Sequence, residues 1–136
     1  MKIPDREETM HILVLEKHQE ACDAVTKILE KKSYGVTALE KTDEALILFK
    51  ENLYPLAIVG ETEDSSSVFE SMKKIVMASP MTSLVLICDL PKEEVDRKAE
   101  GYGILGHVER TIPSESLNSL LEQFEKISQS IHPLKE

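Results

Sequence analysis

The chain has 136 residues, of which 41% are hydrophobic, and this suits one domain with one sizeable core. Acidic residues outnumber basic residues by 25 to 16, and the net charge of −9 argues against a nucleic-acid partner, which would need a basic surface. The apolar runs are too short for a membrane span, the acidic N-terminus is unlike a secretion signal, and two cysteines do not make a disulfide framework. We therefore expect one acidic cytoplasmic domain without membrane contact.

Short apolar runs alternate with segments of helical periodicity along the first half of the chain. Runs that are apolar throughout suit strands buried on both faces, whereas apolar residues three and four apart suit helices. In order, the pattern predicts a strand over His11–Leu15, a helix over Glu20–Lys31, a strand over Val36–Leu39, a helix capped by Thr42, a strand over Leu56–Gly60, a serine-rich loop, and a helix from Val68 to Val76.

The second half repeats the alternation. It predicts a strand over Ser83–Cys88, a short charged helix around Pro91–Glu100 with Asp89 placed to cap it, a strand-like run over Ile104–Val108, and a last helix opened by Pro113. The apolar stripe of that last helix, from Leu117 to Ile127, is the clearest in the sequence.

Five strands alternating with five helices predict an α/β fold. We expect a single doubly wound (βα)5 domain over residues 10–130, with a five-stranded parallel sheet and helices on both faces; residues 1–9 would be a frayed N-terminus and residues 131–136 a tail. Ligands of such sheets bind beyond the carboxyl ends of the strands. That edge should collect Glu16, Lys17, Glu61, Cys88 and Arg110.

Four segments of the chain resemble the receiver domain of two-component response regulators, a flavodoxin-like fold, over about Met10–Ser128. HILVLEKH resembles the opening strand with its acidic pair, and YPLAIVGE resembles the strand that presents the phosphoaccepting aspartate. SLVLICD resembles the strand that ends on a hydroxyl residue, and GHVERTIP resembles the strand that carries an aromatic residue and then Lys-Pro. The separations between these segments are also similar to those of the family.

The chain departs from the family at the functional positions. The resemblance implies Glu61 at the phosphoacceptor, Glu16 and Lys17 at the acidic pocket for Mg²⁺, Cys88 at the hydroxyl position, Arg110 at the lysine, His107 at the switch aromatic and Thr111 at the proline. Lys17 removes an oxygen ligand, and Glu61 is one methylene longer than aspartate, which displaces its oxygen from in-line geometry. We therefore expect a pseudo-receiver without catalytic residues, with no cofactor and with lost or weak Mg²⁺ binding.

The resemblance implies a signalling domain rather than an enzyme. Its partner would be a protein: a kinase, an effector domain or a second copy in a homodimer. The expected docking face is formed by the fourth helix, fifth strand and fifth helix, at about Val95–Glu100, His107–Arg110 and the outer side of Pro113–Ser130.

Two alternative functions stay open. One is an active receiver phosphorylated at an unusual residue such as Asp64 or Asp89. The other is a small-ligand domain or enzyme on a flavodoxin-like sheet. The lack of glycine in Glu16–Gln19, directly after the first strand, counts against a nucleotide or flavin phosphate in that second case.

Glu61 also admits two interpretations. It is either an ordinary solvated loop residue or a carboxylate paired with Lys17 or Arg110. Because converging loops would bring two charges of each sign together, we predict the ion pair. Cys88 is predicted to be a small core residue, with a redox role as the alternative, and His107 to be a half-exposed edge residue.

Overall fold

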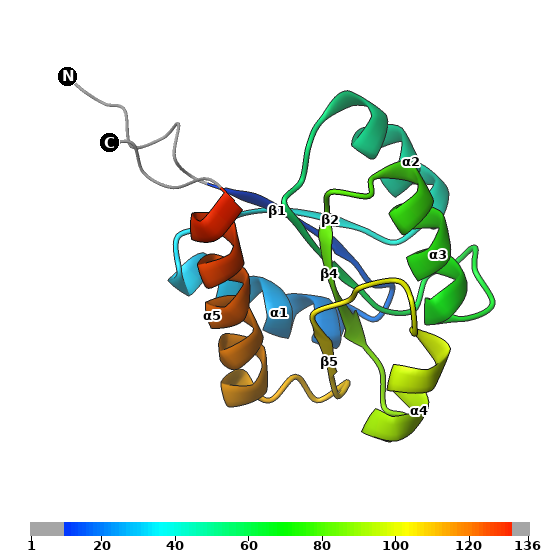
Figure 1. Ribbon diagram of the computed structural model, residues 1–136. Coiled ribbons are helices and arrows are strands. Elements are labelled where there is room, and N and C mark those ends of the chain that lie inside the picture. The colour runs from blue at the N-terminus through cyan, green and yellow to red at the C-terminus, as the bar shows by residue number, and fades with distance from the viewer. Residues whose placement is uncertain (1–9, 132–136) are drawn as a thin grey trace.

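In the computed structural model, which describes residues 10–131, five parallel strands form one sheet in the order β2-β1-β3-β4-β5 (Figure 1). The expected N-terminal segment 1–9 lies outside the described residues, as does the expected tail 131–136 except for Ile131, which ends α5. The elements are β1 (His11–Leu15), α1 (Gln19–Lys31), β2 (Gly35–Leu39), α2 (Thr42–Glu51), β3 (Leu56–Val59), α3 (Val68–Ala78), β4 (Ser83–Ile87), α4 (Lys92–Lys98), β5 (Gly106–Val108) and α5 (Ser114–Ile131). The predicted doubly wound α/β fold is confirmed.

Helices cover both faces of the sheet, with α1 and α5 on one side and α2, α3 and α4 on the other (Figure 1). This explains why the central strands β1, β3 and β4 are almost entirely apolar, whereas the edge strands β2 and β5 are only partly buried. In β1, Ile12 and Val14 pack towards α1 and α5, whereas Leu13 and Leu15 pack towards α2, α3 and α4. Within the described part of the chain, no helix is both long and apolar enough to cross a membrane.

The expectation that Thr42 caps the second helix is wrong. Helix α2 begins at Thr42, and Lys41 stands at the N-cap position without a side-chain hydrogen bond. The cap comes from Asp64, in the loop after β3: its Oδ1 and Oδ2 accept hydrogen bonds from the backbone N–H groups of Thr42 and Asp43, at 2.7 and 3.0 Å. A local capping rule cannot detect a carboxylate that arrives from another loop.

Asp89 does not cap the fourth helix either. Helix α4 begins at Lys92, with Pro91 at its N-cap, and Asp89 instead accepts a hydrogen bond from the backbone N–H of Arg110 at 2.7 Å. The strand predicted over Ile104–Val108 is also shorter, because only Gly106–Val108 forms β5. The Asp89 contact joins the loops after β4 and β5 and so fixes the position of Arg110.

Candidate functional site

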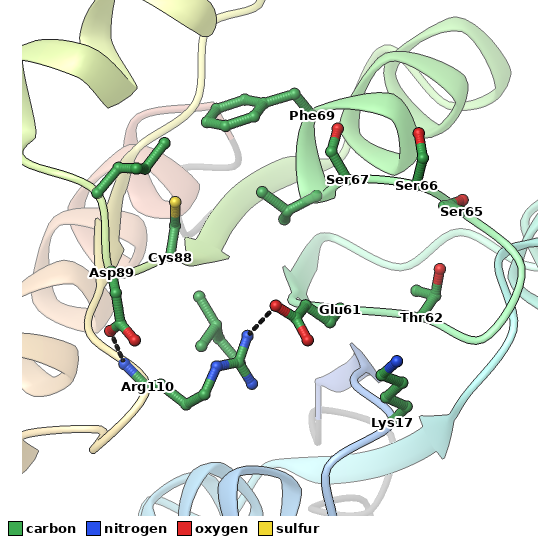
Figure 2. Close-up of a pocket in the computed structure, with 13 residues that line it drawn as sticks. Lys17, Glu61, Thr62, Ser65, Ser66, Ser67, Phe69, Cys88, Asp89 and Arg110 are labelled. Carbon is green, nitrogen blue, oxygen red and sulfur yellow. Dashed lines mark hydrogen bonds and ion pairs between the residues drawn. The ribbon is translucent and has the colours of Figure 1, made fainter.

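A cleft of about 510 Å³ opens at the carboxyl ends of the strands, where the sequence places the site (Figure 2). Its lining includes four of the five side chains expected there: Lys17, Glu61, Cys88 and Arg110. The fifth, Glu16, is buried and contacts Arg110. The loop after β3 and Asp89 supply the rest of the polar lining, and the apolar lining contains Val68, Phe69, Ile87 and Leu90.

Arg110 lies between two carboxylates. Its Nη2 is 3.7 Å from Oε2 of Glu61, and Figure 2 shows the side chain reaching across the cleft towards that residue. The ion pair predicted between Glu61 and Arg110 is therefore present. Nη1 is 3.0 Å from Oε1 of Glu16 but makes no hydrogen bond within the described residues, so this second contact is an ion pair held by charge alone.

His18 is the other partner of Glu61. Its Nε2 lies 2.7 Å from Oε1 of Glu61, and the two side chains are 47% and 52% exposed. This hydrogen bond, with the charges of Arg110, His18 and Lys17, holds the pKa of Glu61 below its usual value, although desolvation acts the other way. The sequence analysis assigns no role to His18. Its position in the loop directly after β1 is the signal that could have identified it as a residue of the site.

Lys17 contacts Glu61 through the backbone only. Its N–H donates to the carbonyl oxygen of Glu61 at 2.7 Å, while its exposed side chain lies at the cleft. Between residues 10 and 131, no ion pair of the Lys17 side chain is found. The cation that neutralises both carboxylates is thus Arg110.

Buried hydroxyl groups anchor the loop that follows Glu61. Oγ1 of Thr42 lies 3.2, 3.0 and 2.9 Å from the hydroxyl oxygens of Thr62, Ser65 and Ser71. Farther along the loop, Oγ of Ser67 accepts the N–H of Glu70 and caps α3. The sequence showed these serines only as a polar loop, because their partners lie on α2 and α3.

Cys88 and His107 lie where the topology predicts. Cys88 is buried directly after β4 and is a free thiol, with its sulfur on the Phe69 side of the cleft in Figure 2. His107 is half-buried on β5, an edge strand of the sheet. No group of three or more His, Cys, Asp or Glu side chains that is able to hold a metal ion occurs in the described residues.

Solved structures of receiver domains superpose on nearly the whole chain. A CheY-like response regulator receiver domain from Methanospirillum hungatei has a TM-score of 0.76 and 16% identity, covering 90% of this chain and 98% of its own. The signal receiver domain of an HD domain-containing protein from Pseudomonas fluorescens has a TM-score of 0.78 and 18% identity, and the match covers 93% of this chain and 94% of that domain's chain. A two-component response regulator from Clostridium difficile has a TM-score of 0.75 and 17% identity, and the match covers 87% of this chain and 97% of the regulator's chain.

The chain has the receiver fold. At these identities the likeness concerns the fold alone, and neither a protein-family model nor a curated protein matches the sequence. The resemblance read from the strand segments is therefore confirmed as a resemblance in fold. The role of Glu61 as the counterpart of a phosphoacceptor, and the roles assigned to Glu16, Lys17, Cys88, His107 and Arg110, stay predictions.

Proposed function

We propose that this receiver-fold domain transmits signals through protein contacts, without phosphorylation of Glu61 and without an enzymatic step of its own. The observation that carries the proposal is that both carboxylate oxygens of Glu61 are already engaged, one by His18 and one by Arg110. Phosphoryl transfer depends on a nucleophilic oxygen that is free and in line with the donor. An engaged carboxylate on a longer side chain is a poor acceptor.

The charge of Arg110 also supports the expectation that Mg²⁺ binding is lost or weak. A guanidinium group lies within ion-pair distance of both Glu16 and Glu61. Mg²⁺ requires oxygen ligands in near-octahedral geometry and is repelled by a neighbouring cation. Arg110 thus takes the counter-ion position that a metal would otherwise fill.

The two aspartates considered as alternative phosphoacceptors already have structural partners. Both oxygens of Asp64 accept hydrogen bonds from the first turn of α2, and these bonds hold its pKa below the usual value although desolvation would raise it. Asp89 accepts the backbone N–H of Arg110. Phosphorylation at Asp64 would release the α2 cap, and phosphorylation at Asp89 would release the loop that carries Arg110.

The partner is proposed to be a protein that docks on α4, β5 and α5. Val95 and Ala99 are buried in the core, so the α4 part of this face is made by its charged side chains. Two ion pairs order them, Lys92 with Asp96 at 2.7 Å and Arg97 with Glu94 at 3.2 Å. A kinase, an effector domain or a second copy of the chain would meet a mixed-charge surface there.

A small ligand in the cleft is the second candidate function. The cleft volume of about 510 Å³ falls within the range of ligand sites, and its walls combine apolar and charged side chains. Saturable binding of a compound that is abolished by substitutions at Phe69 would favour this candidate over protein docking.

Incubation with acetyl phosphate and Mg²⁺ tests the main proposal. We expect the intact mass of the protein to stay unchanged, because Glu61 is engaged and Arg110 excludes the metal. A base-labile phosphoryl adduct that disappears in Glu61→Gln would refute the proposal. An adduct that persists in Glu61→Gln but is lost in Asp64→Asn or Asp89→Asn would support the atypical receiver instead.

A further inference from the structure

We propose that the chain supplies its own anionic ligand beside the cleft: the buried carboxylate of Glu16 fills an anion-binding hollow next to Arg110, and Gly60 provides the room for it. This inference deepens the proposed function, since it explains how the site is held in one state. It concerns Glu16 and Gly60 rather than Glu61, the residue on which the phosphorylation test depends.

Two backbone donors and one cation among the described residues converge on the Glu16 carboxylate. Oε2 accepts the backbone N–H of His18 at 2.8 Å, and Oε1 accepts the backbone N–H of Glu61 at 3.3 Å. The cation is the Arg110 guanidinium, which forms an ion pair with Nη1 3.0 Å from Oε1. Backbone N–H groups combined with a cation are the usual surroundings of a bound oxyanion. Here the oxyanion belongs to the chain.

Gly60 is a steric requirement of this arrangement. A Cβ atom at position 60 would lie 1.9 Å from Oε1 and 2.9 Å from Cδ of Glu16, distances that real side chains do not allow. The backbone cannot move aside easily, because Gly60 donates to the carbonyl of Leu15 at 2.7 Å. Any other residue at position 60 must therefore displace the Glu16 carboxylate from the hollow.

The two acidic partners of Arg110 differ in their exposure. The side chain of Glu16 has no exposed surface, whereas that of Glu61 is 52% exposed. Glu61 is therefore the outer partner, which solvent and ligands reach, and Glu16 is the inner one. A free oxyanion has to displace a carboxylate that is covalently attached to the chain, so the unmodified protein should not bind small anions in this hollow.

A double-mutant cycle between Glu16→Ala and Gly60→Ala tests the assignment. Each single substitution should lower Tm by about 5–10 °C, since one removes the buried anion and the other expels it. In the Glu16→Ala background, Gly60→Ala should lower Tm by less than half of the decrease that it causes in the unmodified protein. The Cβ of Ile87, at 3.3 Å, is then the remaining tight contact. Equal costs of Gly60→Ala in both backgrounds would overturn the proposal.

Chemical rescue provides a second, independent readout. Acetate should raise the Tm of Glu16→Ala in a saturable way, because it restores a carboxylate between Arg110 and the two N–H groups, whereas chloride at equal ionic strength should not. Glu61→Ala is the matched control, since it removes the other carboxylate on the same guanidinium and should show no rescue. An equal response of both variants to acetate would contradict a hollow specific to Glu16.

Glu16→Asp covers the case in which Glu16→Ala does not fold. The aspartate carboxylate is one methylene shorter and stops short of the space beneath Gly60. Gly60→Ala should then be better tolerated in the Glu16→Asp background than beside the native glutamate, and an unchanged cost would overturn the assignment. A phosphoryl adduct on Glu61 in the unmodified protein would refute the proposed function while leaving the result of this cycle unaffected.

Discussion

Arg110 holds two carboxylates by contacts of unequal strength. Its pair with Glu61 is half exposed, so water and salt screen it, whereas its contact with Glu16 is shielded on the carboxylate side. Removing the exposed partner leaves Arg110 with Glu16. Glu61 should therefore matter less for stability than Glu16.

Glu61→Gln should lower the free energy of unfolding by about 1 kcal/mol or less at neutral pH, because the lost pairs are exposed. The pKa of Glu61 is lowered in the folded state, so its contribution exists above the unfolded-state pKa and disappears as the pH falls through the folded-state pKa. The difference in stability between the two proteins should therefore be smaller at about pH 3 than at neutral pH. Urea titrations at both pH values measure this; a difference that widens towards acid pH would contradict it.

Glu40→Gln should have the opposite effect. The side chain of Glu63 raises the pKa of Glu40, through a hydrogen bond to its protonated form and through like charge. An acid whose pKa is raised by folding favours the folded state at low pH and loses that contribution as the pH rises through the folded-state pKa. The neutral variant should therefore melt slightly higher than the unmodified protein at neutral pH, with the difference vanishing in acid. A thermal melt series across pH tests this, with Glu51→Gln, an exposed residue at the end of α2, as a control.

At the scale of elements, α2, α3 and the loop after β3 are joined by the hydroxyl of Thr42. That hydroxyl is fully buried and lies within hydrogen-bond distance of three others. Together with the Asp64 cap, it connects the start of α2 to the loop that begins at Glu61. The position of the cleft wall therefore depends on two helices on the same face of the sheet.

Thr42→Val should destabilise the protein by about 1–3 kcal/mol, because the shape is kept while buried hydroxyl partners lose a hydrogen bond. Chemical denaturation measures this loss. The exposed Thr111 provides the matched control, for which the same substitution should change stability by about 0.5 kcal/mol or less. A comparable effect of the two substitutions would show that the hydroxyl cluster contributes nothing.

The three central strands were predictable from the sequence because they are buried on both faces and are therefore apolar at nearly every position, as in Leu56–Val59. The helix caps were not. The residue before α2 offers no cap, and the group that does so, Asp64, is separated from it in sequence by α2 itself and by β3. Local sequence rules locate helices and strands well. They miss the groups that cap the helix ends when those groups come from a distant part of the sequence.

At the scale of the whole molecule, the topology alone gathered the right residues at one edge of the sheet. It did not determine which cation meets which anion. Lys17 is nearer to Glu16 in sequence, yet Arg110 contacts both Glu16 and Glu61, because the Asp89 contact fixes its backbone beside the cleft. His18 escaped prediction for the same reason, since its contact depends on loop geometry.

The unmodified protein should show the same Tm in low-millimolar Mg²⁺ and in EDTA, because a guanidinium group already neutralises Glu16 and Glu61. Thermal melts under both conditions test this. Replacing Lys17 and Glu61 by aspartate while keeping Arg110 should restore little binding, and Arg110→Ala in addition should restore more. A saturable rise in Tm for the unmodified protein would show that Arg110 yields its position to the metal.

The order of the strands has a consequence for how the chain assembles. β1 pairs with both β2 and β3, so Glu16 and Glu61 come together as soon as the first half of the sheet forms. Arg110 belongs to the last strand's loop and joins only when the second half docks. Until then, Glu61 can pair with His18, but the buried carboxylate of Glu16 lacks the ion-pair partner that it has in the complete sheet. The arginine of the last loop therefore favours all-or-none folding, because the carboxylate that is paired in the complete sheet is an unpaired buried charge in a partly formed one.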